Sequence, residues 1–159
     1  MNPRVGVPVG FVSDRVPVPA RIAPLLKLPR GEEVVLRRCL RSVDGQPWSI
    51  QDSYFPIGIV ERFPELESLN DIARGTINYL QEGGIYQVGF LDQITSRMPT
   101  PGEHEFLRTP KGVPVLVQIR TAYTKTQVVR TTETIWAGDR NVVVYELGDL
   151  DALYPGAEK

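Results

Sequence analysis

Arginine is the most abundant charged residue type in this sequence, and its side chain could form a binding site. Among 18 basic residues, 14 are arginine and 4 are lysine. The planar guanidinium presents a rigid fork of N–H donors that matches carboxylates and phosphates. The composition therefore permits a binding site for a small anion, although a GC-rich genome would produce the same bias.

Histidine and cysteine are too few for the common catalytic and metal sites. The chain has a single histidine, His104, and a single cysteine, Cys39. A Ser-His-Asp triad, or a metal site with even one histidine ligand, would have to use His104. Cys39 can form neither an intrachain disulfide nor a cysteine-based zinc site. We therefore expect no metal and no cofactor, while catalysis by carboxylates stays open.

Length and charge describe an ordinary globular domain. The chain has 159 residues, 42% hydrophobic and 23% charged, with a formal net charge of -1. A free-standing nucleic-acid binder usually carries a strong basic excess, so we expect no DNA binding by this chain alone. No apolar run approaches the roughly 20 residues that span a bilayer, and residues 1–20 lack a signal-peptide core. Together with the lone cysteine, this predicts a cytoplasmic protein.

The hydrophobic pattern predicts six strands and three helices. Residues 1–17 form an expected extended arm or linker, residues 18–150 the domain, and residues 151–159 a tail. Because hairpins dominate and no βαβ alternation appears, the predicted class is α+β, with a mostly antiparallel sheet of about six strands and helices on one face. The predicted strands are 33–43, 46–55, 85–97, 113–123, 127–136 and 142–146, and the helices lie within 19–28, 72–81 and 100–107.

Two local signals fix details of this scheme. Asp44-Gly45 is a strong signal for a two-residue hairpin, and its register would place Val43 opposite Gln46, Arg41 opposite Trp48 and Arg37 opposite Asp52. Further along, Thr100-Pro101-Gly102-Glu103 predicts a helix start, in which Thr100 and Glu103 form a capping box.

Four segments of the sequence carry a family resemblance. The first is LKLPRGEEVVLRRCLRSVDGQPWSIQDSYFP, which ends in a Ser-Tyr-Phe-Pro step. The others are IARGTINYLQEGG, RMPTPGEHEFLRTPKGVPVLVQIRTAY and the Asp139-Arg140 step. Each motif is short, but their order and spacing are specific. Together they resemble the UTRA domain, the effector-binding module of HutC-like regulators in the GntR superfamily, over residues 18–148.

The resemblance implies a chorismate lyase-like fold, a pocket for a small polar or anionic metabolite, a homodimer, and a winged-helix DNA-binding domain upstream. Nothing before Pro19 could form that winged helix, so we expect DNA to be reached only through a domain absent here. The sequence also departs from the family at Cys39, where relatives often carry an arginine, and at Asn141, which replaces a common aromatic residue.

Arg74, Gly75 and Thr76 are the leading candidates for ligand contact. They begin the predicted helix 72–81, whose first backbone N–H groups are free to bind an anion. Gly75 allows close approach, and Thr76 adds a hydroxyl donor. The alternative is an exposed Arg74 that pairs with Asp71 or Glu82.

The other candidates lie on or beside predicted strands. Arg38 points to the face opposite Arg37, and the resemblance implies that this face contributes to the pocket. Arg120 and Glu133 are near-diagonal partners on neighbouring strands, which makes them either a cross-strand salt bridge or a contact for a polar effector. The full set of predicted ligand-binding residues is Arg38, Arg74, Gly75, Thr76, Arg97, Arg120, Tyr123 and Glu133.

Three functions fit these observations. The leading one is a sensing domain of a bacterial transcription regulator, without chemistry of its own. A chorismate lyase-like enzyme is the second, since fold does not imply function. The third is a stand-alone sensor that forms mixed dimers with a full-length regulator.

Overall fold

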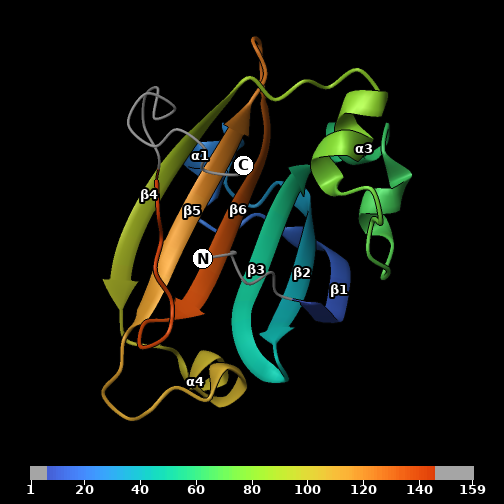
Figure 1. The fold of residues 1–159 in the computed structure, drawn as a ribbon. Helices are drawn as coiled ribbons and strands as arrows, with labels where there is room; N and C mark the ends of the chain where they lie inside the picture. Colours follow the sequence, from blue (N-terminus) through green and yellow to red (C-terminus); the bar gives the residue numbers. More distant parts are fainter. Residues whose placement is uncertain (1–6, 146–159) are drawn as a thin grey trace, which may run out of the picture.

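The protein is built on one six-stranded antiparallel sheet (Figure 1). The computed structural model describes residues 7–145. The strands lie in the order β1-β2-β3-β6-β5-β4, so that two three-stranded halves meet where β3 pairs with β6. The predicted α+β class, with a sheet of about six strands, is confirmed. The strands are β1 Val7–Pro17, β2 Glu33–Val43, β3 Gln46–Pro56, β4 Gly89–Arg97, β5 Val115–Tyr123 and β6 Val128–Ala137.

Six strands are found, but one of them is not among those predicted. Residues 7–17 are extended, as expected of an arm, yet they pair with β2 as the edge strand of the same sheet. Prolines are tolerated there because an edge strand has one side free of ladder hydrogen bonds. The predicted strand 142–146 is wrong for residues 142–145, which lie in no strand, while Glu146 and the tail 151–159 lie outside the described residues.

The β2–β3 hairpin turns at the predicted dipeptide. Asp44 and Gly45 both have positive φ, 50° and 74°. Two consecutive positive φ values define the type I′ turn, whose twist matches that of the flanking strands. Val43 therefore lies opposite Gln46, as predicted.

A bulge just beyond this turn changes the rest of the register. Arg41 pairs with Ser49 and Arg38 with Asp52, so the predicted Arg41–Trp48 and Arg37–Asp52 pairs are wrong. The register shift leaves Trp48 as an extra residue in β3, and one extra residue shifts every later pair by one.

Two helices cover opposite ends of one face of the sheet. Helix α1 (Ala23–Leu26) lies behind the sheet in Figure 1 and packs on Val34, Tyr54 and Val128. Helix α4 (Pro101–Leu107) packs on the other end, against a cluster that includes Ile50 and Ile135.

The predicted capping box at the start of α4 is confirmed. Thr100 Oγ1 accepts from the Glu103 N–H at 3.3 Å, and the Thr100 N–H donates to Glu103 Oε2 at 2.8 Å. Each residue thereby satisfies a backbone N–H group that the helix leaves free.

The opposite face carries three short helical segments at one end, so the expectation of helices on a single face is wrong. The segments are α2 (Ile57–Val60), η1 (Pro64–Glu67) and α3 (Thr76–Glu82). Their apolar side chains, Phe63, Leu66 and Leu80, enclose Phe55 of β3. A second core on this face is needed because Phe55 is fully buried there. No helix among residues 7–145 is long and apolar enough to cross a membrane.

Helix α3 begins four residues later than the predicted helix 72–81. Gly75 stands at the N-cap with a φ of 78°, a conformation outside the helical region. Arg74 therefore precedes the helix instead of lying in its first turn.

We predict that Gly138→Ala destabilises the fold. An added Cβ would lie 2.5 Å from the Pro114 carbonyl oxygen, a backbone atom that cannot move independently. Overpacking of this kind lowers the free energy of unfolding by about 1–3 kcal/mol, measurable by urea denaturation. The control is Gly102→Ala in α4, where the Cβ meets nothing within 4 Å and the urea midpoint should not fall. Equal midpoints for the two variants would contradict the prediction.

Candidate functional site

The face that carries α1 and α4 holds a cavity of about 800 Å³ between these helices. We call it the paired-charge cavity, because each arginine that lines it binds a carboxylate of the same cavity. Arg38 Nε and Nη2 each donate to Asp52 at 2.7 Å, and Arg97 binds Glu103 at 2.7 and 2.8 Å. Arg21 donates to both Glu133 oxygens. The lining includes the apolar residues Leu40, Ile50, Phe106, Val117, Ile119 and Ile135.

Two of the three carboxylates of this cavity are buried and need their arginines. Asp52 and Glu133 are each 4% exposed and lie directly opposite each other on β3 and β6. Like charges in that arrangement repel, and an unpaired buried charge is costly. At the cavity wall, hydrogen bonds from Arg97 lower the pKa of Glu103. The charges on this face are therefore already balanced before any ligand arrives.

The opposite face holds a smaller cavity of about 320 Å³ with a different charge balance. We call it the arginine cavity. Its lining contains three arginines and no acidic residue. The lining residues are Arg41, Trp48, Ser49, Gln51, Gln118, Arg120, Arg130, Thr132, Thr134 and Trp136.

Arg130 is the residue of this cavity whose charge is least compensated. Its Nε atom is enclosed by protein and has no hydrogen-bond partner among the described residues. Burial, and next the nearby Arg120 guanidinium, lower the pKa of Arg130 to about 10. The side chain still carries its charge at neutral pH. The arginine cavity thus presents a partly buried cation, with an enclosed Nε atom, that an anionic ligand could neutralise.

Arg120 is held at the edge of the same cavity by a carboxylate from outside it. Its Nε and Nη2 donate to Asp92 of β4 at 2.7 and 2.6 Å. Asp92 also accepts from the Tyr145 hydroxyl at 2.8 Å and from Gln118 Nε2 at 3.0 Å. The Arg120 hydrogen bonds, above all, lower the pKa of Asp92. Four donor groups therefore share this carboxylate, and Arg120 is fixed in place.

The predicted pairing of Arg120 with Glu133 is wrong. In the β5–β6 register Arg120 lies opposite Thr132, and Glu133 lies opposite Ile119. Successive residues of a strand point to opposite faces, so the two side chains lie on different sides of the sheet. Arg120 belongs to the arginine cavity, and Glu133 to the paired-charge cavity.

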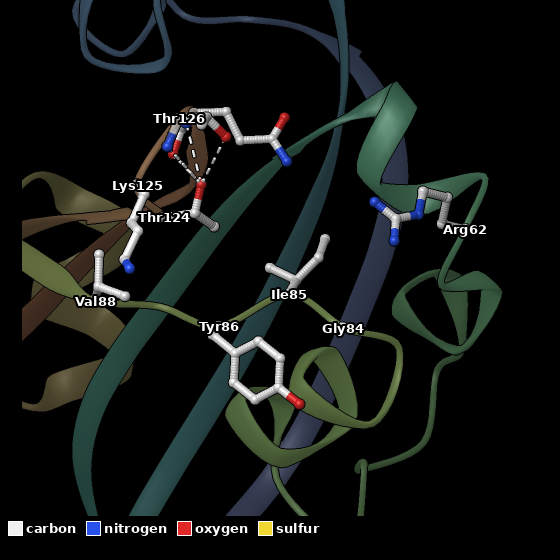
Figure 2. Close-up of a pocket in the computed structure, with 9 residues that line it drawn as sticks. Arg62, Gly84, Ile85, Tyr86, Val88, Thr124, Lys125 and Thr126 are labelled. Atoms are coloured by element: carbon white, nitrogen blue, oxygen red, sulfur yellow. Dashed lines mark hydrogen bonds between the residues drawn. The ribbon is translucent and has the colours of Figure 1, made fainter.

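A third cavity, of about 540 Å³, lies where the link from α3 to β4 meets the β5–β6 turn. Figure 2 shows Arg62 on one side of it, Lys125 on the other, and Tyr86 between them. The turn is closed by the Thr124 hydroxyl, which accepts from the N–H groups of Thr126 and Gln127 (Figure 2). Arg62, Tyr86 and Lys125 are exposed, so this cavity encloses no charged group.

The structure brings only some of the predicted site residues together. Arg38, Arg97 and Glu133 line the paired-charge cavity, and Arg120 lines the arginine cavity. Tyr123 packs beside the α1 core and lines none of the three cavities.

Arg74, Gly75 and Thr76 also lie outside the three cavities. Arg74 is exposed and binds Glu65 and Glu82, each at 2.8 Å. Pairing with Glu82 is the alternative that the sequence left open for this residue. Its guanidinium also lies 4.5 Å from the centre of the Tyr79 ring.

Sequence reasoning missed Arg130, the central cation of the arginine cavity. Its position two residues before Thr132 and four before Thr134 does place it on the same face of β6 as these threonines. That pattern predicts the face of the sheet on which Arg130 lies. Whether an acidic side chain pairs with Arg130 depends on the residues of the neighbouring strands, which the pattern does not show. His104, the single histidine, is exposed and bonds to Thr109 at 2.8 Å.

The side chains that line the arginine cavity are suited to binding an organic anion. Within residues 7–145, no group of three or more His, Cys, Asp or Glu side chains could hold a metal ion. The arginine cavity offers an enclosed cation, amide and hydroxyl side chains, and two indoles. This set can bind an organic anion.

Comparison with known proteins places the fold in a family. The UTRA domain model matches residues 11–141. A solved protein described as a GntR-family transcriptional regulator superposes with a TM-score of 0.81 and 20% identity, over 91% of this chain and 60% of that one. The chain thus spans less than two thirds of that relative's length.

Two solved domains match over most of their own length. One is described as the ligand-binding domain of a GntR-family regulator from Bordetella bronchiseptica, with a TM-score of 0.74, 21% identity, and coverage of 91% of this chain and 90% of that one. The other is the C-terminal domain of the histidine utilization repressor from Pseudomonas syringae pv. tomato str. DC3000, with a TM-score of 0.73, 16% identity, and coverage of 91% and 100%.

At these identities the solved structures show a shared fold, and the family itself rests on the sequence match. That match spans most of the sheet and all of its described helices. It confirms the resemblance carried by the four sequence segments: the chain belongs to the UTRA domain family.

Proposed function

We propose that this chain is the effector-sensing domain of a bacterial, HutC-like transcription regulator of the GntR superfamily, and that its effector is a small anion bound in the arginine cavity. The domain would act in the cytoplasm as a homodimer. It would reach DNA through a winged-helix domain elsewhere in the regulator. The match to a structure described as a ligand-binding domain of a GntR-family regulator supports this role.

The observation that carries the proposal is the uncompensated charge of Arg130. The Arg130 side chain is partly buried, and its Nε atom is enclosed without a hydrogen-bond partner among residues 7–145. Desolvation of this cation lowers the stability of the empty domain, because no hydrogen bond at Nε offsets it. An anion that binds Arg130 would remove this cost and would gain a charge-assisted hydrogen bond. An anion would gain less in the paired-charge cavity, because the arginines there already bind Asp52, Glu103 and Glu133.

The location of the cavity suggests how binding would be transmitted. Its lining comes from β2, β3, β5 and β6, and it therefore spans the junction between the two halves of the sheet. A ligand that favours one arrangement of the halves, or of two subunits, shifts the population toward it. A regulator uses such a coupling free energy to change the geometry of its paired DNA-binding domains.

We predict that an anion from a panel of phosphorylated sugars, amino acids and organic acids raises the melting temperature of the protein, and that Arg130→Met weakens its binding. Loss of a hydrogen bond to a charged group costs roughly 1.5–3 kcal/mol, which corresponds to at least a tenfold increase in Kd. Calorimetry on the purified chain measures this change.

Arg30→Met is the control for that measurement. Arg30 is exposed and lines none of the three cavities, so its replacement removes a positive charge without changing the site. Its Kd should equal that of the unmodified protein. A panel without any binder, or a binder that Arg130→Met leaves unaffected, would rule out the proposed site.

The unpaired charge also predicts opposite stability changes for two arginine-to-methionine variants. Arg130→Met should leave the free energy of unfolding unchanged or raise it by up to about 3 kcal/mol, since it removes a cation whose pKa burial lowers to about 10. Arg38→Met should lower it by roughly 1–2 kcal/mol, because the buried Asp52 loses its partner while Arg38 itself is partly exposed. Urea denaturation at pH 7 without ligand compares them. A marked loss in Arg130→Met would show that Arg130 stabilises the fold.

The homodimer gives a further prediction. Strand β4 forms one edge of the sheet and exposes Phe90, Leu91 and Ile94, each more than 40% exposed. An apolar edge strand invites pairing with another chain, and paired DNA-binding domains require a two-fold interface. Light scattering at micromolar concentration should give twice the mass of the chain, and Ile94→Lys should shift the protein toward the monomer. A monomer in the unmodified protein would contradict this.

A further inference from the structure

Two tryptophans share the arginine cavity with Arg130, and a β-bulge brings one of them there. Ser42 pairs with Pro47 and Arg41 with Ser49, which leaves Trp48 as the extra residue of β3. A bulge re-aims side chains that would otherwise alternate between faces. As a result the consecutive residues Trp48 and Ser49 both line the cavity.

The second indole comes from the neighbouring strand β6. Trp136 of β6 is directly opposite Ser49, the residue that follows Trp48. Both indoles are only partly buried, and both line the cavity, so each presents a surface to a ligand. Aromatic surfaces of this kind favour a flat apolar group through stacking or edge-to-face packing.

The cation and the indoles mark the two ends of the cavity. Arg130 precedes Trp136 by six residues on the same strand, which separates their backbones by roughly 20 Å. Thr132 and Thr134 lie between them on the same face and also line the cavity. Arg130 therefore lies toward one end of the cavity, and the two indoles lie toward the other, where Arg41 pairs with Ser49.

From this arrangement we propose that the ligand is an elongated aromatic carboxylate, which binds Arg130 through its carboxylate and the two tryptophans through its ring. The inference rests on the proposed anion site and specifies its ligand class. A compact anion such as phosphate would neutralise Arg130 and leave the indoles uncovered. A cationic ligand is disfavoured because the lining carries three arginines and no acidic residue.

The two indoles provide a direct readout. The chain contains two tryptophans, and both line this cavity, so emission excited at a wavelength that tryptophan absorbs and tyrosine does not reports on this cavity. The probe is 4-phenylbutyrate, compared with 4-phenylbutyramide, 4-phenylbutylamine, butyrate and inorganic phosphate. We expect saturable change of the emission with 4-phenylbutyrate and binding at least tenfold weaker for the amide, the amine and butyrate.

Variants separate the contributions of charge and ring. Arg130→Met should weaken 4-phenylbutyrate binding at least tenfold, in calorimetry as well as in fluorescence. Trp48→Leu should weaken it about fivefold, as expected for the loss of one aromatic contact, while leaving phosphate binding unchanged. Tyr86→Leu is the matched control, because Tyr86 is an exposed aromatic residue of a different cavity.

The outcomes distinguish this inference from the proposed function. If 4-phenylbutyrate binds no better than butyrate, or if Trp48→Leu leaves its affinity unchanged, the aromatic ligand class is wrong. The anion site would survive that result if phosphate or a phosphorylated sugar still bound in a manner that depends on Arg130. If Arg130→Met changes the binding of no anion, both proposals fail.

Discussion

The pairing of β3 with β6 is the constraint on which the rest of the structure depends. It joins the half built from β1, β2 and β3 to the half built from β6, β5 and β4. On one face its register sets Asp52 opposite Glu133, and on the other it sets Gln51 opposite Thr134 and Ser49 opposite Trp136. The paired-charge cavity and the arginine cavity both include residues of this ladder in their linings.

The β3–β6 ladder also determines the position of helix α1 on the sheet. Two carboxylates placed opposite each other in a buried position repel, and each needs its own cation. Arg38 on β2 supplies one, and Arg21, which lies two residues before the start of α1, supplies the other. The apolar packing of α1 on Val34 and Tyr54 and the neutralisation of Glu133 therefore require the same placement of this helix.

Features encoded by a few neighbouring residues could be predicted from the sequence. The Asp44-Gly45 turn and the Thr100–Glu103 capping box are examples, because dihedral preferences and local hydrogen bonds suffice to specify them. The β-bulge at Trp48 could not be predicted, since it depends on how β3 meets its neighbours on both sides. Its omission displaced the whole predicted register beyond the turn.

Long-range pairing explains the remaining differences. The valines and prolines of residues 7–17 suit an extended chain, but only the free edge of β2 turns that chain into a strand. Arg38, Arg97, Arg120 and Glu133 were recognised as polar residues of a site, yet their distribution over two faces follows from the registers of three ladders. The incomplete charge compensation of Arg130 can be recognised only once the positions of the surrounding strands are known.

The incompletely compensated charge of Arg130 has a consequence for the abundance of the protein in a cell. A domain with an unneutralised internal charge unfolds more often when empty than when an anion occupies it. Proteases degrade the unfolded population, so even one or two kcal/mol alters steady-state abundance several-fold. If the arginine cavity binds a metabolite, the amount of regulator would rise and fall with the metabolite it senses, without any change in the rate at which its gene is expressed.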